Sequence, residues 1–225
     1  MTGHEHDHDH GHGGEAAPTD AAQLWDELYR SRPKVWSGRP NPQLVAEAGT
    51  LPPGRALDLG CGEGADALWL AQQGWTVTAM DVSAVALERA KAHAQETAPG
   101  ADIEWVLQDL ASWVPEPLFD LVTAQFLHST VLPWQQSLRL AAAAVRTGGT
   151  LLLVGHHPAG LPPWGRHNSP DKYFTAEEVV QELGLEAPEW RLDVVDTRHR
   201  SATGPDGETA TLADAVLRAT RLLPG

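Results

Sequence analysis

The segment Leu57–Gly64 reads Leu-Asp-Leu-Gly-Cys-Gly-Glu-Gly and combines small residues with two carboxylates. Because glycine has no side chain, Gly60 and Gly62 would let the backbone pack closely against a ligand. Dinucleotide sites space their glycines G-x-G-x-x-G, whereas the glycines here stand at every second position, and Glu63 would place a negative charge beside a pyrophosphate. The segment therefore argues against a dinucleotide and favours a nucleoside that carries positive charge, which Asp58 and Glu63 would attract.

Two further acids follow the next two apolar runs of the chain. Asp81 comes directly after the second run, where a carboxylate can accept hydrogen bonds from both ribose hydroxyls, and Asp109 follows the third, within reach of an adenine amine. Either acid alone is by default a solvated turn residue. Together they indicate a nucleoside site, because open α/β sheets bind ligands at successive strand ends.

The elements that must position these residues alternate between strand and helix. Helices open the chain at about 20–32 and 42–48, with Asp20 and Asn41 as their caps. The predicted strands, each a short apolar run, are 55–59, 75–80, 103–107, 119–124 and 150–154. The predicted helices between them are 65–73, a helix capped by Ser83 that runs to about 97, and 133–145. This alternation predicts a parallel sheet with helices on both faces.

The C-terminal third breaks the alternation. Thr175 and Glu178 form a capping box that opens a helix, and 190–200 and 209–219 are strand-like runs joined by the turn Gly204–Gly207. A hairpin there would make the last strand antiparallel. The sequence thus predicts a Rossmann-like, doubly wound, seven-stranded, mostly parallel sheet.

Composition limits the alternatives. The 225 residues hold one domain, predicted over 19–225 and preceded by a disordered His- and Asp-rich tail, 1–18. A net charge of −14 repels phosphate backbones, which argues against nucleic acid as a partner. No apolar run is long enough for a bilayer, and the single cysteine, Cys61, fits a reducing compartment and a packing role. We expect a cytoplasmic protein without membrane contact; its oligomeric state is not indicated.

The N-terminal tail carries its own chemistry. Imidazoles alternate there with Glu5, Asp7 and Asp9, and both groups are competent ligands for zinc, nickel or copper. The candidate metal ligands are His4, His6, His8, His10 and His12. A flexible strip pays ordering entropy on binding, so we expect micromolar chelation and not a catalytic centre.

Four segments in order, 57–64 (LDLGCGEG), 80–83 (MDVS), 108–110 (QDL) and 146–149 (RTGG), resemble the motif series of class I S-adenosylmethionine-dependent methyltransferases. The resemblance covers roughly residues 33–155. Residues 36–41 (WSGRPN) are similar to a segment of the branch that includes tellurite-resistance and thiopurine or thiol methyltransferases. The resemblance implies cofactor contacts at Trp36, Asp58, Gly60, Gly62, Asp81, Val82, Asp109, Leu110 and Gln125.

The acceptor side is less defined. The segment after the fourth strand faces the cofactor in this fold, and His128 is the candidate general base for an alcohol or thiol, with a packing role as the alternative. The stretch 156–173 is rich in prolines and aromatic residues and is interpreted as a roof over the acceptor, or else as a rigid surface connector.

The function expected from these observations is methyl transfer from S-adenosylmethionine to a small acceptor, such as a thiol or a chalcogen oxyanion. Alignment of the acceptor, the methyl carbon and the sulfonium supplies much of the acceleration, and no metal is required. One alternative is a non-catalytic protein that binds S-adenosylmethionine or a metal on the same fold. The other, a nicotinamide-dependent oxidoreductase, is disfavoured by the glycine spacing.

Overall fold

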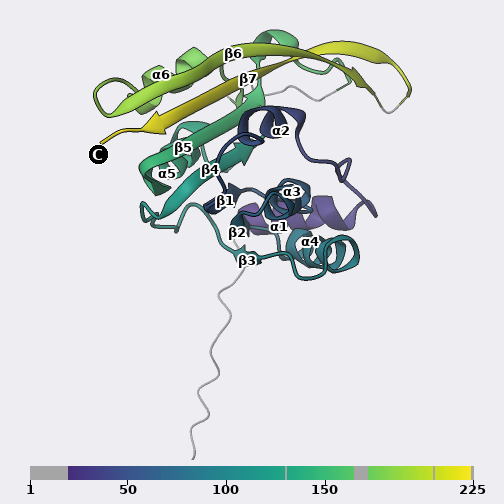
Figure 1. Cartoon of the computed structure of the whole chain (residues 1–225). Coiled ribbons are helices and arrows are strands. Elements are labelled where there is room, and N and C mark those ends of the chain that lie inside the picture. Colours follow the sequence, from purple (N-terminus) through teal and green to yellow (C-terminus); the bar gives the residue numbers. More distant parts are fainter. Residues whose placement is uncertain (1–19, 130, 165–171, 205, 224–225) are drawn as a thin grey trace, which may run out of the picture.

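The computed structural model describes residues 20–129, 131–164, 172–204 and 206–223. They contain a seven-stranded sheet in the order β3-β2-β1-β4-β5-β7-β6 (Figure 1). The strands are β1 (Arg55–Leu59), β2 (Thr76–Asp81), β3 (Ile103–Leu107), β4 (Phe119–Gln125), β5 (Val145–His156), β6 (Trp190–Thr203) and β7 (Thr209–Arg221). The helices are α1 (Asp20–Arg30), α2 (Pro42–Ala48), α3 (Ala65–Gln72), α4 (Ala84–Thr97), α5 (Trp134–Ala144) and α6 (Ala176–Leu183).

The first five strands are parallel and the last is not. β1 pairs with β2 and β4, β2 with β3, and β4 with β5, all in parallel register. β7 is antiparallel to both β5 and β6, because the tight turn after β6 sends the chain straight back along the sheet. The predicted Rossmann-like sheet with an antiparallel last strand is therefore confirmed.

The helix starts follow the caps that the sequence supplies. The side chain of Asn41 accepts a hydrogen bond from the backbone of Gln43 at the start of α2, and that of Ser83 accepts one from Ala86 at the start of α4. Thr175 and Glu178 form the predicted capping box of α6. These local hydrogen bonds fix where the chain leaves each strand end.

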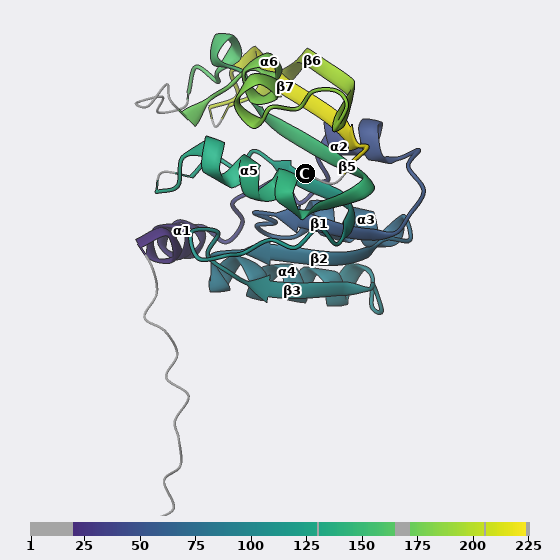
Figure 2. The same cartoon turned by 90° about the vertical axis from the view of Figure 1, so that its left-hand side faces the viewer.

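The sheet divides the helices into two layers. In Figure 1 α5 and α6 lie to the left of the sheet, and α2, α3 and α4 lie to its right; Figure 2 shows the strands stacked from β3 at the bottom to β6 at the top. One core cluster packs α5 and α6 against Leu57, Leu151 and Leu217, and the second packs α2 and α3 against Leu121 and Leu152. None of the described helices is both long and apolar enough to cross a bilayer.

The start of β5 differs from the prediction. β5 begins at Val145, five residues before the predicted strand, because Val145 already pairs with Phe119 and Gly148, at φ +80°, takes up the resulting irregularity. Between β3 and β4 the chain forms turns and no helix, and Leu110 and Trp113 pack on the α5 side of the sheet in place of a helix.

Candidate functional site

The glycine loop runs from the end of β1 to the start of α3. Gly60, Gly62 and Gly64 have φ values of +71°, +52° and +80°, a region that side chains disfavour. The backbone N–H of Gly60 donates to the carbonyl of Met80 on β2 at 2.8 Å, which ties the loop to the neighbouring strand. A Cβ at Gly60 would lie 2.6 Å from Leu127 Cδ1, so any other residue there would displace the end of that side chain.

Asp81 lies directly beneath the loop at the end of β2. Its Oδ2 accepts a hydrogen bond from Gly62 N at 2.8 Å, and its Oδ1 accepts one from Ser83 N at 2.9 Å. Burial raises the pKa of this carboxyl, and the backbone donors partly offset the rise. Asp81 therefore joins the loop to the N-terminus of α4, at the strand end where the sequence predicts a ribose-binding acid.

Two more carboxylates lie near the loop, the buried Asp58 and the partly buried Asp66. Asp58 on β1 is 2% exposed, and its Oδ2 has no hydrogen-bond partner among the residues that the structure describes. Burial, followed by the charges of Asp66 and Asp81, raises the pKa of Asp58 well above its usual range. Asp66 on α3 accepts a hydrogen bond from Asn41 N at 2.6 Å, and burial raises its pKa to about 6. Three acids gathered out of water favour a cation at the loop.

The sequence analysis missed Asp66. An acid two residues after the last glycine reads as an ordinary first-turn residue of a helix, and α3 does begin there. What places Asp66 in the site is the segment before α2, which comes from elsewhere in the chain.

Cys61, inside the loop, is a packing residue. Its side chain is buried in the core cluster on the α2 and α3 side of the sheet. Burial and the charges of Asp81 and Asp58 raise the pKa of the thiol well above its usual range. The thiol is therefore protonated at neutral pH and a poor nucleophile.

Glu63 does not act as the sequence analysis supposed. Its carboxylate forms an ion pair with Arg89 Nη1 on α4 at 3.0 Å and accepts hydrogen bonds from the backbone N–H groups of Val35 and Trp36. These contacts occupy Glu63, so it neither presents a free charge to a ligand nor argues against a dinucleotide. Its position anchors the segment before α2 to the loop.

Trp36 lies over the loop as the resemblance implied. Its Nε1 donates to the hydroxyl of Tyr29 at 2.9 Å, and a Cβ at Gly62 would meet that hydroxyl at 2.9 Å and Trp36 Nε1 at 3.3 Å. Trp36 is 50% exposed. A half-exposed indole that rests on a bare glycine leaves an aromatic face available beside the loop.

The other predicted contacts lie at neighbouring strand ends. Asp109 follows β3, and its carboxylate accepts from Ala111 N at 2.9 Å in a turn that holds the partly buried Leu110. Val82 follows β2 and is partly buried. Gln125 ends β4, and its buried Oε1 has no hydrogen-bond partner among the described residues. All four lie along the C-terminal edge of the parallel strands, where the nucleoside site was expected.

His128 lies in a cluster of rings beyond β4. Its Nδ1 lies 2.8 Å from the carbonyl oxygen of Lys172, and its Nε2 accepts a hydrogen bond from His156 N at 3.1 Å. Burial, then the charge of His156, lowers the pKa of His128 to about 4. A neutral imidazole with both nitrogens bonded to backbone has no lone pair to offer, so these contacts favour the packing alternative over the general base.

The backbone at Phe126 is unusual. It has φ +54°, the one positive value among the described non-glycine residues, and its ring centroid lies 4.5 Å from that of His156. Strained backbone of this kind costs about 1–3 kcal/mol and concentrates at functional sites. The bend turns the chain after β4 so that Leu127 covers Gly60 while Phe126 reaches β5.

Parts of the predicted site fall outside the described residues. These are the five tail histidines, His4, His6, His8, His10 and His12, together with His167 and Pro170 of the predicted roof. Within the described ranges, no group of three or more His, Cys, Asp or Glu side chains is placed to hold a metal ion.

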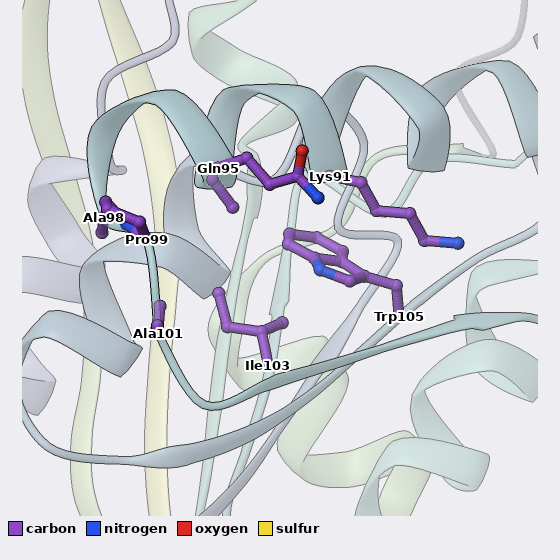
Figure 3. Close-up of a pocket in the computed structure, with 9 residues that line it drawn as sticks. Lys91, Gln95, Ala98, Pro99, Ala101, Ile103 and Trp105 are labelled. Atoms are coloured by element: carbon purple, nitrogen blue, oxygen red, sulfur yellow. The ribbon is translucent and has the colours of Figure 1, made fainter.

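A surface groove of about 270 Å³ lies away from this site. Figure 3 shows it between α4 and the edge strand β3, with Lys91, Gln95, Ile103 and Trp105 among its lining side chains. It opens at the start of β3, the opposite end of the sheet from the glycine loop. The groove therefore has no part in the chemistry described above.

Comparison with known proteins agrees with the geometry. A family model described as a methyltransferase domain matches residues 56–149. A probable thiol methyltransferase of Arabidopsis thaliana is 28% identical over 192 residues, covering 80% of this chain and 79% of that protein. A trans-aconitate 2-methyltransferase of Streptomyces avermitilis is 30% identical, covering 81% of this chain and 64% of the relative. A solved structure, reported for the conversion of a disulfide bond into a thioacetal group during echinomycin biosynthesis, superposes with a TM-score of 0.68 at 25% identity, covering 89% of this chain and 91% of that one.

Proposed function

We propose a small, soft methyl acceptor, a thiol or a comparable chalcogen anion, for this chain, which belongs to the class I S-adenosylmethionine-dependent methyltransferases. The enzyme's donor brings a sulfonium whose methyl carbon is open to displacement. What remains for the chain is to bind that cation, to align the acceptor and to exclude water.

The buried acid cluster is the observation that carries the donor side of the proposal. Asp58, Asp66 and Asp81 lie close enough together for their charges to interact, and Asp58 Oδ2 lacks a partner among the described residues. An ammonium or sulfonium group would relieve this repulsion, whereas a pyrophosphate would increase it. Repulsion from these three acids therefore argues against a dinucleotide ligand, whereas Glu63 does not. Trp36 and the bare Gly62 provide a flat surface beside them.

We assign the donor contacts to the residues that line this edge of the sheet. In this proposal the carboxylate of Asp81 accepts hydrogen bonds from the ribose hydroxyls in place of its backbone donors. Asp109 and Leu110 lie beside the adenine. Asp58 and Gln125, with their unpartnered oxygens, face the methionine ammonium. Val82, Gly60 and Gly62 complete the surface.

The ring cluster supports the acceptor side. The centroids of Phe126, His128 and Tyr173 lie 4.5, 5.3 and 6.3 Å from that of His156. Aromatic rings contact sulfur favourably because sulfur is polarisable. Methylation of a thiol is also the probable activity that the name of the Arabidopsis relative gives.

An acceptor panel tests the proposal. Purified chain would be incubated with S-adenosylmethionine and, separately, with thiols, thiocyanate, chalcogen oxyanions, phenols, carboxylates and small amines, while S-adenosylhomocysteine is measured. We expect the highest kcat/KM with a thiol or another soft anion. A clear preference for carboxylates, the acceptor class named for the aconitate relative, would overturn the acceptor assignment while leaving the donor site intact.

A further inference from the structure

A row of polar side chains continues along the sheet beyond the donor site. The strand register and the two-residue alternation place four polar residues on the face opposite the α5-side core: Asp58 on β1, Gln125 on β4, His156 on β5 and Asp214 on β7. Asp214 and His156 are direct partners in the antiparallel ladder. The row therefore extends from the glycine loop, strand by strand, to a histidine and an acid that the donor contacts leave unused.

Asp214 is buried beside that histidine and forms an ion pair with Arg200. It is 1% exposed, and its Oδ2 accepts a hydrogen bond from Arg200 Nε at 2.7 Å. Its Oδ1 has no hydrogen-bond partner among the described residues and lies 4.0 Å from His156 Nδ1. A buried carboxylate with one oxygen so placed stabilises an imidazolium more than a neutral ring.

The ring of His156 packs against two neighbouring rings, and its side chain is partly exposed. It stacks on His128 with centroids 5.3 Å apart and planes 10° apart, and it contacts Phe126. His128 also accepts the backbone N–H of His156, which fixes the strand end. The side chain of His156 keeps 25% of its surface exposed, whereas that of Asp214 keeps 1%. The histidine is thus the member of the pair that a small molecule can reach.

On the basis of the proposed function, we propose that His156 is the general base for acceptors that carry a proton, with Asp214 and His128 as its positioning residues. Nε2 of His156 takes the proton from the thiol as the sulfur lone pair bonds to the methyl carbon. The bond between that carbon and the sulfonium breaks, and its electron pair stays on the donor sulfur. The imidazolium that results is stabilised by Asp214 and returns its proton to water.

Among the residues that the structure describes, charged and titratable groups near the His156 ring come from four elements. Asp214 on β7 and Arg200 on β6 form the ion pair, His128 follows β4, and Tyr173 precedes α6. Arg200 also lies over the Phe126 ring, with Cζ 5.6 Å from its centroid. The Arg200 guanidinium therefore contacts Asp214 and Phe126, and the Asp214 carboxylate lies 4.0 Å from His156 Nδ1.

Comparing the turnover of two acceptors distinguishes base catalysis by His156 from its other contributions to turnover. Thiocyanate carries no proton and needs no base, whereas 2-mercaptoethanol must lose one. At pH 7 we expect His156→Gln to lower turnover of 2-mercaptoethanol about 100-fold or more and turnover of thiocyanate less than about threefold. Asp214→Asn should lower turnover of the thiol about tenfold, and the matched exposed variant His199→Gln should change neither acceptor.

Raising the pH provides the second readout. Thiols ionise by themselves above roughly pH 8.5, so turnover of 2-mercaptoethanol by His156→Gln should rise with pH toward that of the unaltered chain. Turnover that is lost because the site is structurally disturbed would not recover at high pH. Equal losses on both acceptors, or no recovery at high pH, would overturn the base assignment.

The proposed function is tested separately in the same experiment. Turnover of thiocyanate by the unaltered chain needs no base, so its failure counts against the soft acceptor and not against His156. Donor affinity, measured by calorimetry, should stay within about twofold in His156→Gln and Asp214→Asn. A variant that keeps this affinity is folded, and its acceptor ratio then decides the role of His156.

Discussion

At the scale of single residues, the donor end of the site is governed by carboxylates that the fold buries before any ligand is bound. Asp58, Asp66 and Asp81 each have a pKa raised chiefly by burial. The folded chain therefore holds an unfavourable charge cluster that a cationic ligand relieves. Binding affinity and the stability of the empty protein should consequently respond in opposite directions to removal of these charges.

Replacing Asp81 tests the donor site directly. Asp81→Asn keeps the shape but removes the charge and one acceptor from the loop, so affinity for S-adenosylmethionine should fall about 10- to 100-fold, as expected for loss of a charged hydrogen bond. Calorimetric titration measures it. Asp102→Asn, an exposed acid at the other end of the sheet that accepts from Thr76 Oγ1, is the control and should stay within about twofold. Unchanged affinity in Asp81→Asn would count against the site.

The pH dependence of stability tests the charge cluster. The folded pKa of Asp66, about 6, exceeds the roughly 3.9 of an unfolded Asp, so the folded chain binds more protons between these values. The stability associated with Asp66 is therefore complete below about pH 4 and is lost as the pH rises to about 6. Asn does not titrate, so the Asp66→Asn variant should not show this loss of stability.

Urea titrations of the unliganded protein check this sign. The free energy of unfolding of Asp66→Asn minus that of the unaltered chain should grow between about pH 4 and 6 by at most about 1.4 kcal/mol per pH unit. A difference that shrinks over this window would mean that Asp66 is stabilised as an anion, contrary to the described burial.

At the scale of elements, the segment between α1 and α2 is held over the glycine loop by one ion pair. Arg89 on α4 binds Glu63 and also donates to the carbonyls of Tyr29 and Arg32 at 2.5 and 2.9 Å. Glu63 in turn binds the backbone of Val35 and Trp36. The cover of the donor site is therefore coupled to α4 and to the loop itself.

Arg89→Met should release this cover. The Glu63 side chain is 11% exposed, and removing its partner leaves a nearly buried charge, so we expect a loss of about 1–3 kcal/mol in the free energy of unfolding. Faster limited proteolysis between α1 and α2 should accompany it. Arg30→Met breaks the exposed pair with Asp26 and should cost no more than about 0.5 kcal/mol. Equal losses in both variants would contradict the anchoring role.

How far the sequence determines these elements depends on the range of the interactions. Asn41, Ser83 and Thr175 cap helices through contacts two or three residues away, so the helix starts could be predicted. The partner of Glu63 lies 26 residues along the chain, and that of His156 lies across an antiparallel ladder. Neither of these two contacts has a signal in the local sequence. The role of Glu63 was therefore predicted wrongly, and His128 was predicted as the base from its place after β4.

At the scale of the whole molecule, the residues proposed for the donor and those proposed for the acceptor lie on different strands of the sheet. β1 and β2, which end at the glycine loop, carry Asp58 and Asp81, and β5 and β7, farther along the sheet, carry His156 and Asp214. Gln125 and Phe126 at the end of β4 lie between them. Acceptor chemistry can thus change on β5 and β7 without disturbing the donor site.

The N-terminal tail is predicted to bind metal, a property that methyl transfer does not need. His4, His6, His8, His10 and His12 alternate with acids in the sequence, which places imidazole and carboxylate ligands close together along the chain. Because its ordering costs entropy, we predict zinc binding in the micromolar range in the full chain and none in a version that starts at Ala16. Calorimetric titration of zinc into both proteins measures the difference, and equal heats would contradict it.

Methyl transfer by alignment needs no metal, so treatment with a chelator should remove the zinc heat and leave turnover unchanged. A loss of turnover on chelation would instead connect the tail to the reaction.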